Sequence, residues 1–348
     1  MVKTALPRRR NRDAAQRFAV NALLLIAVNL FMRTVGVAFN AYLAERAGGE
    51  VMGLYSLLFG VYGLAMTLGS AGIHLGTTRM VADVMGRFCS EETGTAEGRD
   101  GEICRRAIRR VMVKCLTYSL VCGVGAGLLM LVSAPLIGNG WLGDGRTVLS
   151  LRVLALTLPP IAVSACLGGY FTAVRRVVRT SAVGIGVQLL RIGFCAYLLT
   201  LWLPEGVEMT CLALVLGGAL SEFCGLLMTV CAYAFDRHRH LRVTRGGTCE
   251  DMGEADSAKK LLGITVPVTL AACLRSGLLT LQHILIPRGL KQSGASWEAA
   301  LTSYGVLHSM ALPVVLFPSA FISSFSGFYS LKISSNYRII ITCSQAGH

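Results

Sequence analysis

The chain has 348 residues, of which 53% are hydrophobic and 15% are charged, and its mean hydropathy is +0.59. Because a soluble domain carries about 25% charged residues, this composition excludes an ordinary soluble domain and indicates a membrane protein. The formal net charge of +14 would suit a nucleic-acid partner only if the basic residues formed one surface.

Eight apolar segments are long enough to cross a bilayer, because a transmembrane helix needs about 20 residues and a barrel strand only about ten. In lipid, only helices and closed barrels satisfy the backbone hydrogen bonds. The sequence therefore predicts an all-α polytopic membrane protein with about eight transmembrane helices. They are expected at residues 18–44, 51–78, 111–137, 148–174, 180–203, 210–235, 261–287 and 299–327.

The basic residues lie mostly on one side of the membrane if the eight spans alternate. Of the 33 lysines and arginines, 25 fall on the side of the N-terminus, five on the opposite side and three inside spans. The positive-inside rule then predicts a cell-membrane protein with a cytoplasmic N-terminus. We interpret the basic loops as topology signals that contact membrane lipids, and we expect no nucleic-acid partner.

Two spans carry a lone arginine that is followed seven residues later by an amide. Arg33 precedes Asn40 in the first span, and Arg275 precedes Gln282 in the seventh. Seven residues make about two helical turns, so each amide shares a face with its arginine. A cation at this depth costs at least ~2.5 kcal/mol, so it is expected to face a bundle interior or a wet cavity.

The third arginine inside a span, Arg191, lies at a depth that matches that of Glu222 in the next span. An ion pair between these neighbouring helices is predicted. Its role stays open between a structural link that holds the bundle and a part in transport.

The repeated Arg-x₆-amide pattern predicts two parallel lobes related by an axis along the membrane normal. We expect a basic cytoplasmic tail at 1–17, a six-helix N-lobe at 18–235 and a cytoplasmic linker at 236–260. The first two helices of a second lobe follow at 261–327, and the polar tail at 328–348 is too short to span. The missing helices favour a truncated or frame-shifted gene, with a deliberate half-size protein as the alternative.

Several other features have local interpretations. The motifs Gly72-x-x-x-Gly76 and Gly123-x-x-x-Gly127 are expected to form packing faces, because small residues let helices approach closely. Pro159-Pro160 predicts a kink in the fourth span. Residues 96–110 predict a separate amphipathic helix on the inner membrane surface.

No HExxH, DxxD or Ser/His/Asp constellation is visible, and His74, His283 and His308 stand alone in their spans. The cysteines form no CxxC pair, and their spacing fits no zinc site. We therefore expect no enzymatic activity, no cofactor and no metal.

Two stretches carry a resemblance to a known family. They are MRTVGVAFNAYLAERAGGEVMGLYSLLFGVYGLAMTLGSAGIHLGTTRMVAD and ITVPVTLAACLRSGLLTLQHILIPRGLKQSGASWEAALTSYGVLHSMALPVVLFPSAF. The chain resembles the stage V sporulation protein B branch of the polysaccharide exporters. This branch belongs to the multidrug/oligosaccharidyl-lipid/polysaccharide superfamily, which includes the lipid II flippases.

The resemblance implies two six-helix lobes around a central cavity, and transport by alternating access. It implies export of an isoprenyl-pyrophosphate-linked sugar lipid in peptidoglycan or spore-cortex synthesis. Arg33 and Arg275 would bind the pyrophosphate, with Asn40 and Gln282 beside them. The sequence departs from the family pattern where an acidic residue is common in place of Gln282, and where four to six further helices follow the eighth span.

Two alternatives remain at this stage. A cation-coupled multidrug antiporter of the same superfamily would need intramembrane carboxylates, and here the deep charges are three arginines and Glu222. A non-transporting scaffold or an inactive fragment would fit the missing helices.

Overall fold

The computed structural model describes residues 8–89, 99–142, 145, 147–174, 176–240, 254–294, 296–316 and 318. These residues form helices joined by short turns and include no strand. The chain divides into two units, Met1–Tyr42 with Leu307–His348, and Leu43–Val306. Each unit is described by itself.

The helices correspond to the predicted spans and extend beyond most of them. Their bounds are α1 Arg8–Ala47, α2 Gly49–Cys89, α3 Arg99–Leu136, α4 Thr147–Ala173, α5 Val177–Trp202, α6 Val207–His240, α7 Glu254–Gln292, α8 Trp297–Val306 and α9 Leu312–Val315, with short 3-10 or π-helical turns at Ile137–Leu142, Leu203–Glu205 and Leu307–Ala311.

Among the described residues, six helices, α2 to α7, are long and apolar enough to cross a membrane. The predicted first span lies within α1, a continuous helix of 40 residues. The predicted eighth span begins with α8, and its residues 319–327 lie outside the described part of the chain. The all-α polytopic class is confirmed.

Three predicted regions meet the limits of the described chain. Helix α1 begins at Arg8, inside the predicted tail 1–17, because the stretch that follows Pro7 is rich in arginine and also contains alanine, and both residues favour helix. Residues 241–253 of the predicted linker and the whole predicted tail 328–348 lie outside the described residues.

The prediction of a separate surface helix at 96–110 is wrong for the residues that the structure describes. Helix α3 runs without a break from Arg99 through its apolar segment to Leu136. Between Glu102 and Cys122 the sequence contains no glycine or proline that would end the helix. The basic residues here therefore form the first turns of the spanning helix.

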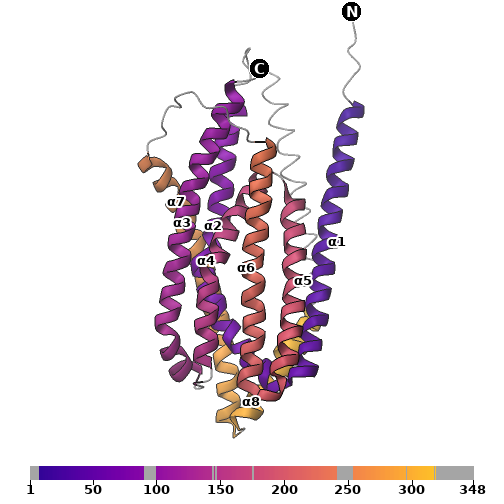
Figure 1. Cartoon of the computed structure of the whole chain (residues 1–348), viewed down its shortest axis with the longest axis vertical. Helices are drawn as coiled ribbons and strands as arrows, with labels where there is room; N and C mark the ends of the chain where they lie inside the picture. Colours follow the sequence, from indigo (N-terminus) through magenta and orange to yellow (C-terminus); the bar gives the residue numbers. More distant parts are fainter. Residues whose placement is uncertain are drawn as a thin grey trace, which may run out of the picture. The chain divides into compact units, whose positions relative to one another are not determined.

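In the unit Leu43–Val306, α2 and α4 occupy the middle of the bundle. Helix α2 packs against α3, α4, α6, α7 and α8, and α4 packs against α2, α3 and α6. Figure 1 shows α2 to α7 running roughly along one direction, with α5 beside α6. Helix α5 packs mainly on α6, so the other helices of this unit leave much of its surface uncovered.

Glycines allow the close approach between α3 and α4. A Cβ atom added at Gly123 would lie 2.8 Å from the Ala162 side chain, and one at Gly127 would lie 2.9 Å from the Ala155 carbonyl oxygen. The packing interpretation of this motif is confirmed. The α-helix α4 continues through Pro159, which lies against Gly123.

A second set of glycines on α2 fixes the position of α7 and α8. A Cβ atom at Gly53 would overlap the Leu301 carbonyl oxygen, and one at Gly60 would lie 2.8 Å from the His283 side chain. Gly72 is equally close to Thr265 of α7, so its packing role is confirmed. The Thr280 hydroxyl also donates to the Gly60 carbonyl oxygen, at 2.8 Å. Helix α7 therefore has one defined face toward α2.

Candidate functional site

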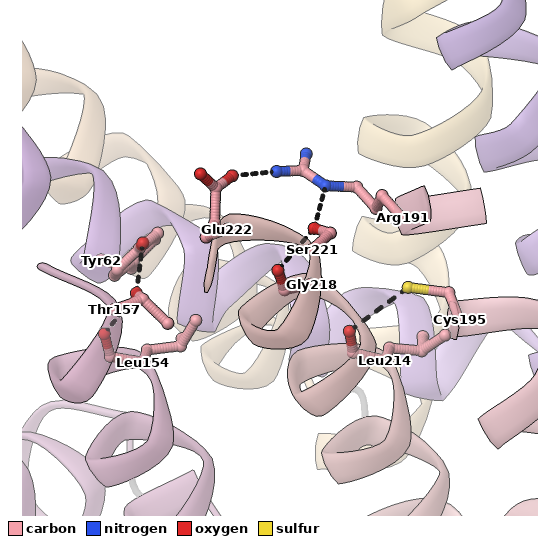
Figure 2. Close-up of polar contacts among 9 residues, drawn as sticks. All are labelled: Tyr62, Leu154, Thr157, Arg191, Cys195, Leu214, Gly218, Ser221 and Glu222. Atoms are coloured by element: carbon pink, nitrogen blue, oxygen red, sulfur yellow. Dashed lines mark hydrogen bonds and ion pairs between the residues drawn. The ribbon is translucent and has the colours of Figure 1, made fainter. Parts of the chain in front are cut away.

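Arg191 and Glu222 meet in the middle of the membrane-spanning part of the bundle. Arg191 lies at the midpoint of the apolar segment Val178–Glu205 of α5, and Glu222 at that of Val207–Asp236 of α6. Arg191 Nη2 is 2.5 Å from Glu222 Oε1, and Arg191 Nε is 3.5 Å from Ser221 Oγ. Figure 2 shows the guanidinium group reaching from α5 toward both side chains.

The pair is held by close packing between the two helices. A Cβ atom at Gly217 would lie 2.8 Å from Cys195, so the backbones of α5 and α6 nearly touch one turn away. The Ser221 hydroxyl donates to the Gly218 carbonyl oxygen at 2.6 Å. The two opposite charges of Arg191 and Glu222 cancel. Their side chains are 33% and 26% exposed, so the pair is only partly covered by the surrounding helices.

A second polar link joins the central helices in the same region. The hydroxyl groups of Tyr62 on α2 and Thr157 on α4 are 2.7 Å apart and buried. Thr157 Oγ1 also donates to the Leu154 carbonyl oxygen at 2.7 Å (Figure 2). Thr157 therefore donates along its own helix and accepts from Tyr62, which satisfies the buried hydroxyl groups.

Arg275 and Gln282 share a face of α7 that lies to the side of the face packed on α2. At about 100° per residue, they lie roughly 80–140° around the helix from Thr265, Thr269 and His283, all three of which contact α2 glycines. Both side chains are exposed. Within the part of the chain that the structure describes, no carboxylate lies within 4.0 Å of Arg275.

Arg33 and Asn40 lie on α1, in the unit that contains Met1–Tyr42. Arg33 is exposed and Asn40 is half-buried. Each predicted arginine–amide pair thus shares a helix face. The structure brings Arg191 and Glu222 into contact, while Arg33 and Arg275 belong to different units.

Sequence reasoning missed an ion cluster around Asp236 at the end of α6. Its side chain is 1% exposed, and its Oδ1 contacts the guanidinium groups of Arg176 and Arg179. The Tyr170 hydroxyl donates to Asp236 Oδ2 at 3.2 Å. The signal was available, because Asp236 ends one apolar span and a run of arginines, Arg175–Arg179, begins another.

Two histidines that the sequence shows as isolated have partners in space. His283 Nδ1 shares a short hydrogen bond with the Tyr304 hydroxyl of α8. His74 Nε2 lies 3.4 Å from the Thr172 hydroxyl of α4. The first pair joins consecutive helices 21 residues apart and the second joins residues 98 apart, so neither partner falls within one local motif.

The fold and these charges define a class of protein. Long apolar helices in a close-packed bundle, with arginines and a carboxylate at mid-span, are typical of multi-pass membrane transporters, in which such groups mark substrate or ion pathways.

Comparison with known proteins gives the family. The family model described as "Polysaccharide biosynthesis protein" matches residues 18–248. The chain belongs to this family, which is a family of transporters.

Two relatives come from Bacillus subtilis (strain 168). Stage V sporulation protein B is 24% identical over 307 residues, which cover 88% of this chain and 56% of the relative. Sporulation protein YkvU is 19% identical over 312 residues, which cover 87% of this chain and 62% of the relative. The chain thus spans little more than half the length of these relatives.

A solved structure shares the fold. It is an inward-facing multidrug resistance MATE family transporter of the MOP superfamily, with a TM-score of 0.56 at 18% identity. The match covers 89% of this chain and 66% of that one. The MATE-like arrangement of the helices is therefore shown.

Proposed function

We propose that this chain acts in the export of an isoprenyl-pyrophosphate-linked sugar across the cell membrane, as a flippase that works by alternating access. The proposed orientation has the N-terminus in the cytoplasm, as the bias of 25 to five basic residues indicates. The family supports a polysaccharide-related substrate, and the sporulation relatives support a role in the cell wall or spore cortex.

The observation that carries the proposal is the contrast between the arginines inside the spans. Glu222 neutralises Arg191. Arg275 is exposed on an apolar helix, and no described carboxylate neutralises it. Leu274 and Leu278 beside it are 67% and 70% exposed. Because a bare cation in hydrocarbon is costly, Arg275 requires an anionic partner that this helix face can receive.

A pyrophosphate headgroup meets that requirement. It carries about two negative charges, and the guanidinium fork binds phosphate oxygens through paired charge-assisted hydrogen bonds. In our proposal Arg33 and Arg275 bind one headgroup from the two lobes. Asn40 and Gln282, about two helical turns from their arginines, offer neutral hydrogen bonds to the same ligand. The lobes rock around this fixed site.

A multidrug antiporter is the main rival, and the described charges do not favour it. A cationic drug needs an available carboxylate at mid-span. Glu222 lies at mid-span, and its Oε1 is already 2.5 Å from Arg191. The remaining mid-span charges are cations, which attract anions.

The proposal is tested by transport in proteoliposomes that contain the purified chain. We expect translocation of a fluorescent isoprenyl-pyrophosphate-linked disaccharide, and its loss in Arg33→Ala and Arg275→Ala with normal membrane insertion. Arg152→Ala is the matched control, because Arg152 is exposed near the start of α4 and lies outside the proposed site.

Three results would contradict the proposal. Translocation at the wild-type rate in both arginine variants would show that Arg33 and Arg275 do not form a pyrophosphate-binding site. Transport of a cationic dye in place of the lipid would favour the antiporter. Absence of both activities would favour a non-transporting scaffold.

A further inference from the structure

A cavity of about 250 Å³ lies inside the unit Leu43–Val306, between α2, α3 and α7. Leu68 of α2, Tyr118 of α3, and Val266 and Leu270 of α7 are among its lining residues. Ligand pockets for drug-sized molecules run from about 300 to 1,000 Å³. The cavity therefore has room for part of an elongated molecule.

One polar group in the cavity wall has no partner in the described chain. Thr265 is 2% exposed, and its Oγ1 makes no hydrogen bond to any described residue. Helical threonines usually donate to the carbonyl oxygen four residues earlier. Thr67, Thr172 and Thr229 of this chain do so, at 2.7 to 2.9 Å.

Packing accounts for the exception at Thr265. Its methyl group faces Gly72 of α2 so closely that a Cβ atom there would overlap it. The close contact orients the side chain, and the hydroxyl is left without an acceptor. Burying an unpaired hydroxyl is unfavourable, so an acceptor that enters the cavity would be stabilising.

The rim of the cavity is exposed and apolar. Leu68, Val266 and Leu270 are 44%, 52% and 62% exposed, and all three lie in membrane-spanning segments. An occupant can therefore enter sideways from the lipid. Thr265 lies within the first two turns of the apolar stretch of α7 that follows Lys260, so with a cytoplasmic N-terminus the hydroxyl lies near the inner surface.

We propose that, before the headgroup reaches Arg33 and Arg275, this cavity binds the first part of the isoprenoid chain of the transported lipid, and that the Thr265 hydroxyl then donates to the oxygen that joins this chain to its phosphate. The inference rests on the proposed function. A prenyl phosphate has one chain and one ester oxygen at its end, which matches a narrow cavity whose fully buried donor, Thr265, has no partner among the described residues. A diacyl lipid would have to separate its two chains to fit.

The test uses the full chain in lipid nanodiscs and a prenyl phosphate that carries a diazirine on the isoprene unit next to the phosphate. After illumination, adducts are mapped by mass spectrometry. We expect adducts near Tyr118 on α3 and near Thr265 and Cys273 on α7, and we expect unlabelled prenyl phosphate to compete with them.

Two variants with a matched control sharpen the result. Thr265→Val keeps the side-chain shape, and it is expected to lower the apparent affinity of cavity labelling about tenfold and to leave the unfolding midpoint equal to or above that of the wild type. Leu270→Trp on the rim is expected to block labelling. Leu278→Trp, at a 70% exposed position on the opposite face of α7, is expected to label as the wild type.

The inference is overturned if Thr265→Val labels as the wild type, or if excess phosphatidylcholine competes as well as prenyl phosphate does. Competed adducts found only around Arg275 would refute the cavity and leave the proposed function standing. A complete lack of competed adducts would contradict both.

Discussion

The helix pair α5–α6 and the outer face of α7 carry the same kind of residue at mid-span in two different settings. On α5, Arg191 has a carboxylate 2.5 Å away and a hydroxyl group at 3.5 Å. On α7, Arg275 is exposed among leucines and has no carboxylate beside it in the described chain. Among the described residues, the first charge is neutralised and the second is not.

The difference separates structural from functional charge. A paired arginine links two helices, and its charge is not available to bind a ligand. An unpaired one is a cost to the folded protein in lipid, and it is kept only if something else binds it. The predictions below test each half of this contrast, beginning with the largest expected change in stability.

Among the described paired charges, the Asp236 cluster should show the largest loss in the free energy of unfolding when its carboxylate is removed. Asp236→Asn would leave Arg176 and Arg179 side by side without their carboxylate. Because Asp236 is 1% exposed, we expect a loss of about 3–5 kcal/mol in the free energy of unfolding, measured by denaturant titration in micelles. Glu208→Gln, at an exposed first-turn position of α6, is the control and should cost at most about 1 kcal/mol. Equal effects would show that the cluster is not structural.

The Arg191–Glu222 pair should follow the same rule at a smaller scale. Glu222→Gln leaves Arg191 unpaired in a setting that is about one-third exposed, so we expect a loss of about 1–3 kcal/mol. Arg191→Leu with Glu222→Leu removes both charges and should restore most of that stability. If the double variant is less stable than Glu222→Gln, the pair does more than neutralise charge.

The orientation of Arg275 depends on the contact between α2 and α7. Gly60→Ala would place a methyl group 2.8 Å from the His283 side chain, and we expect a loss of about 1–3 kcal/mol from overpacking. Gly63→Ala, three residues along the same helix, has open space around it and should be neutral or stabilising by up to about 1 kcal/mol. Unfolding midpoints of the two variants check this, and a cost at Gly63 that matches the cost at Gly60 would contradict the packing argument.

The variant with the smallest expected effect, Arg275→Lys, tests whether the shape of the guanidinium group matters in addition to its charge. Arg275→Lys keeps the positive charge and loses the planar fork. We expect the apparent affinity for the isoprenyl-pyrophosphate lipid to fall about tenfold, as expected for one lost charged hydrogen bond, with little change in stability. An affinity equal to that of the wild type would mean that charge alone is sensed.

The class of fold was predictable from the sequence because hydropathy and span length constrain membrane helices strongly. All the described helices from α2 to α7 fall on predicted spans. The Arg191–Glu222 contact was also predictable, since two adjacent antiparallel helices place residues at equal depth together. The error at residues 99–110 arose because an amphipathic, basic pattern is shared by surface helices and by spanning helices that extend out of the membrane.

Other features required three-dimensional information. The contact of Gly60 with His283 joins segments that the sequence separates widely, and the hydrogen bond between His283 and Tyr304 joins two consecutive helices. The cavity beside Thr265 forms because the side chains of α2, α3 and α7 leave a space between them. A local sequence pattern cannot predict such a space. Arg33 and Arg275 were found by their chemistry, and their joint role as a pyrophosphate site stays a prediction.

The most direct test of the account compares two ways of removing a mid-span arginine from the same chain. Lipid translocation in proteoliposomes is measured for Arg275→Ala and for the charge-free double variant Arg191→Leu with Glu222→Leu. We predict a drop of at least about 100-fold for Arg275→Ala, since it removes up to two charged hydrogen bonds, and activity close to the wild type for the double variant. Full activity in Arg275→Ala, or equal losses in the two proteins, would contradict the claim that the unpaired arginine binds the phosphate.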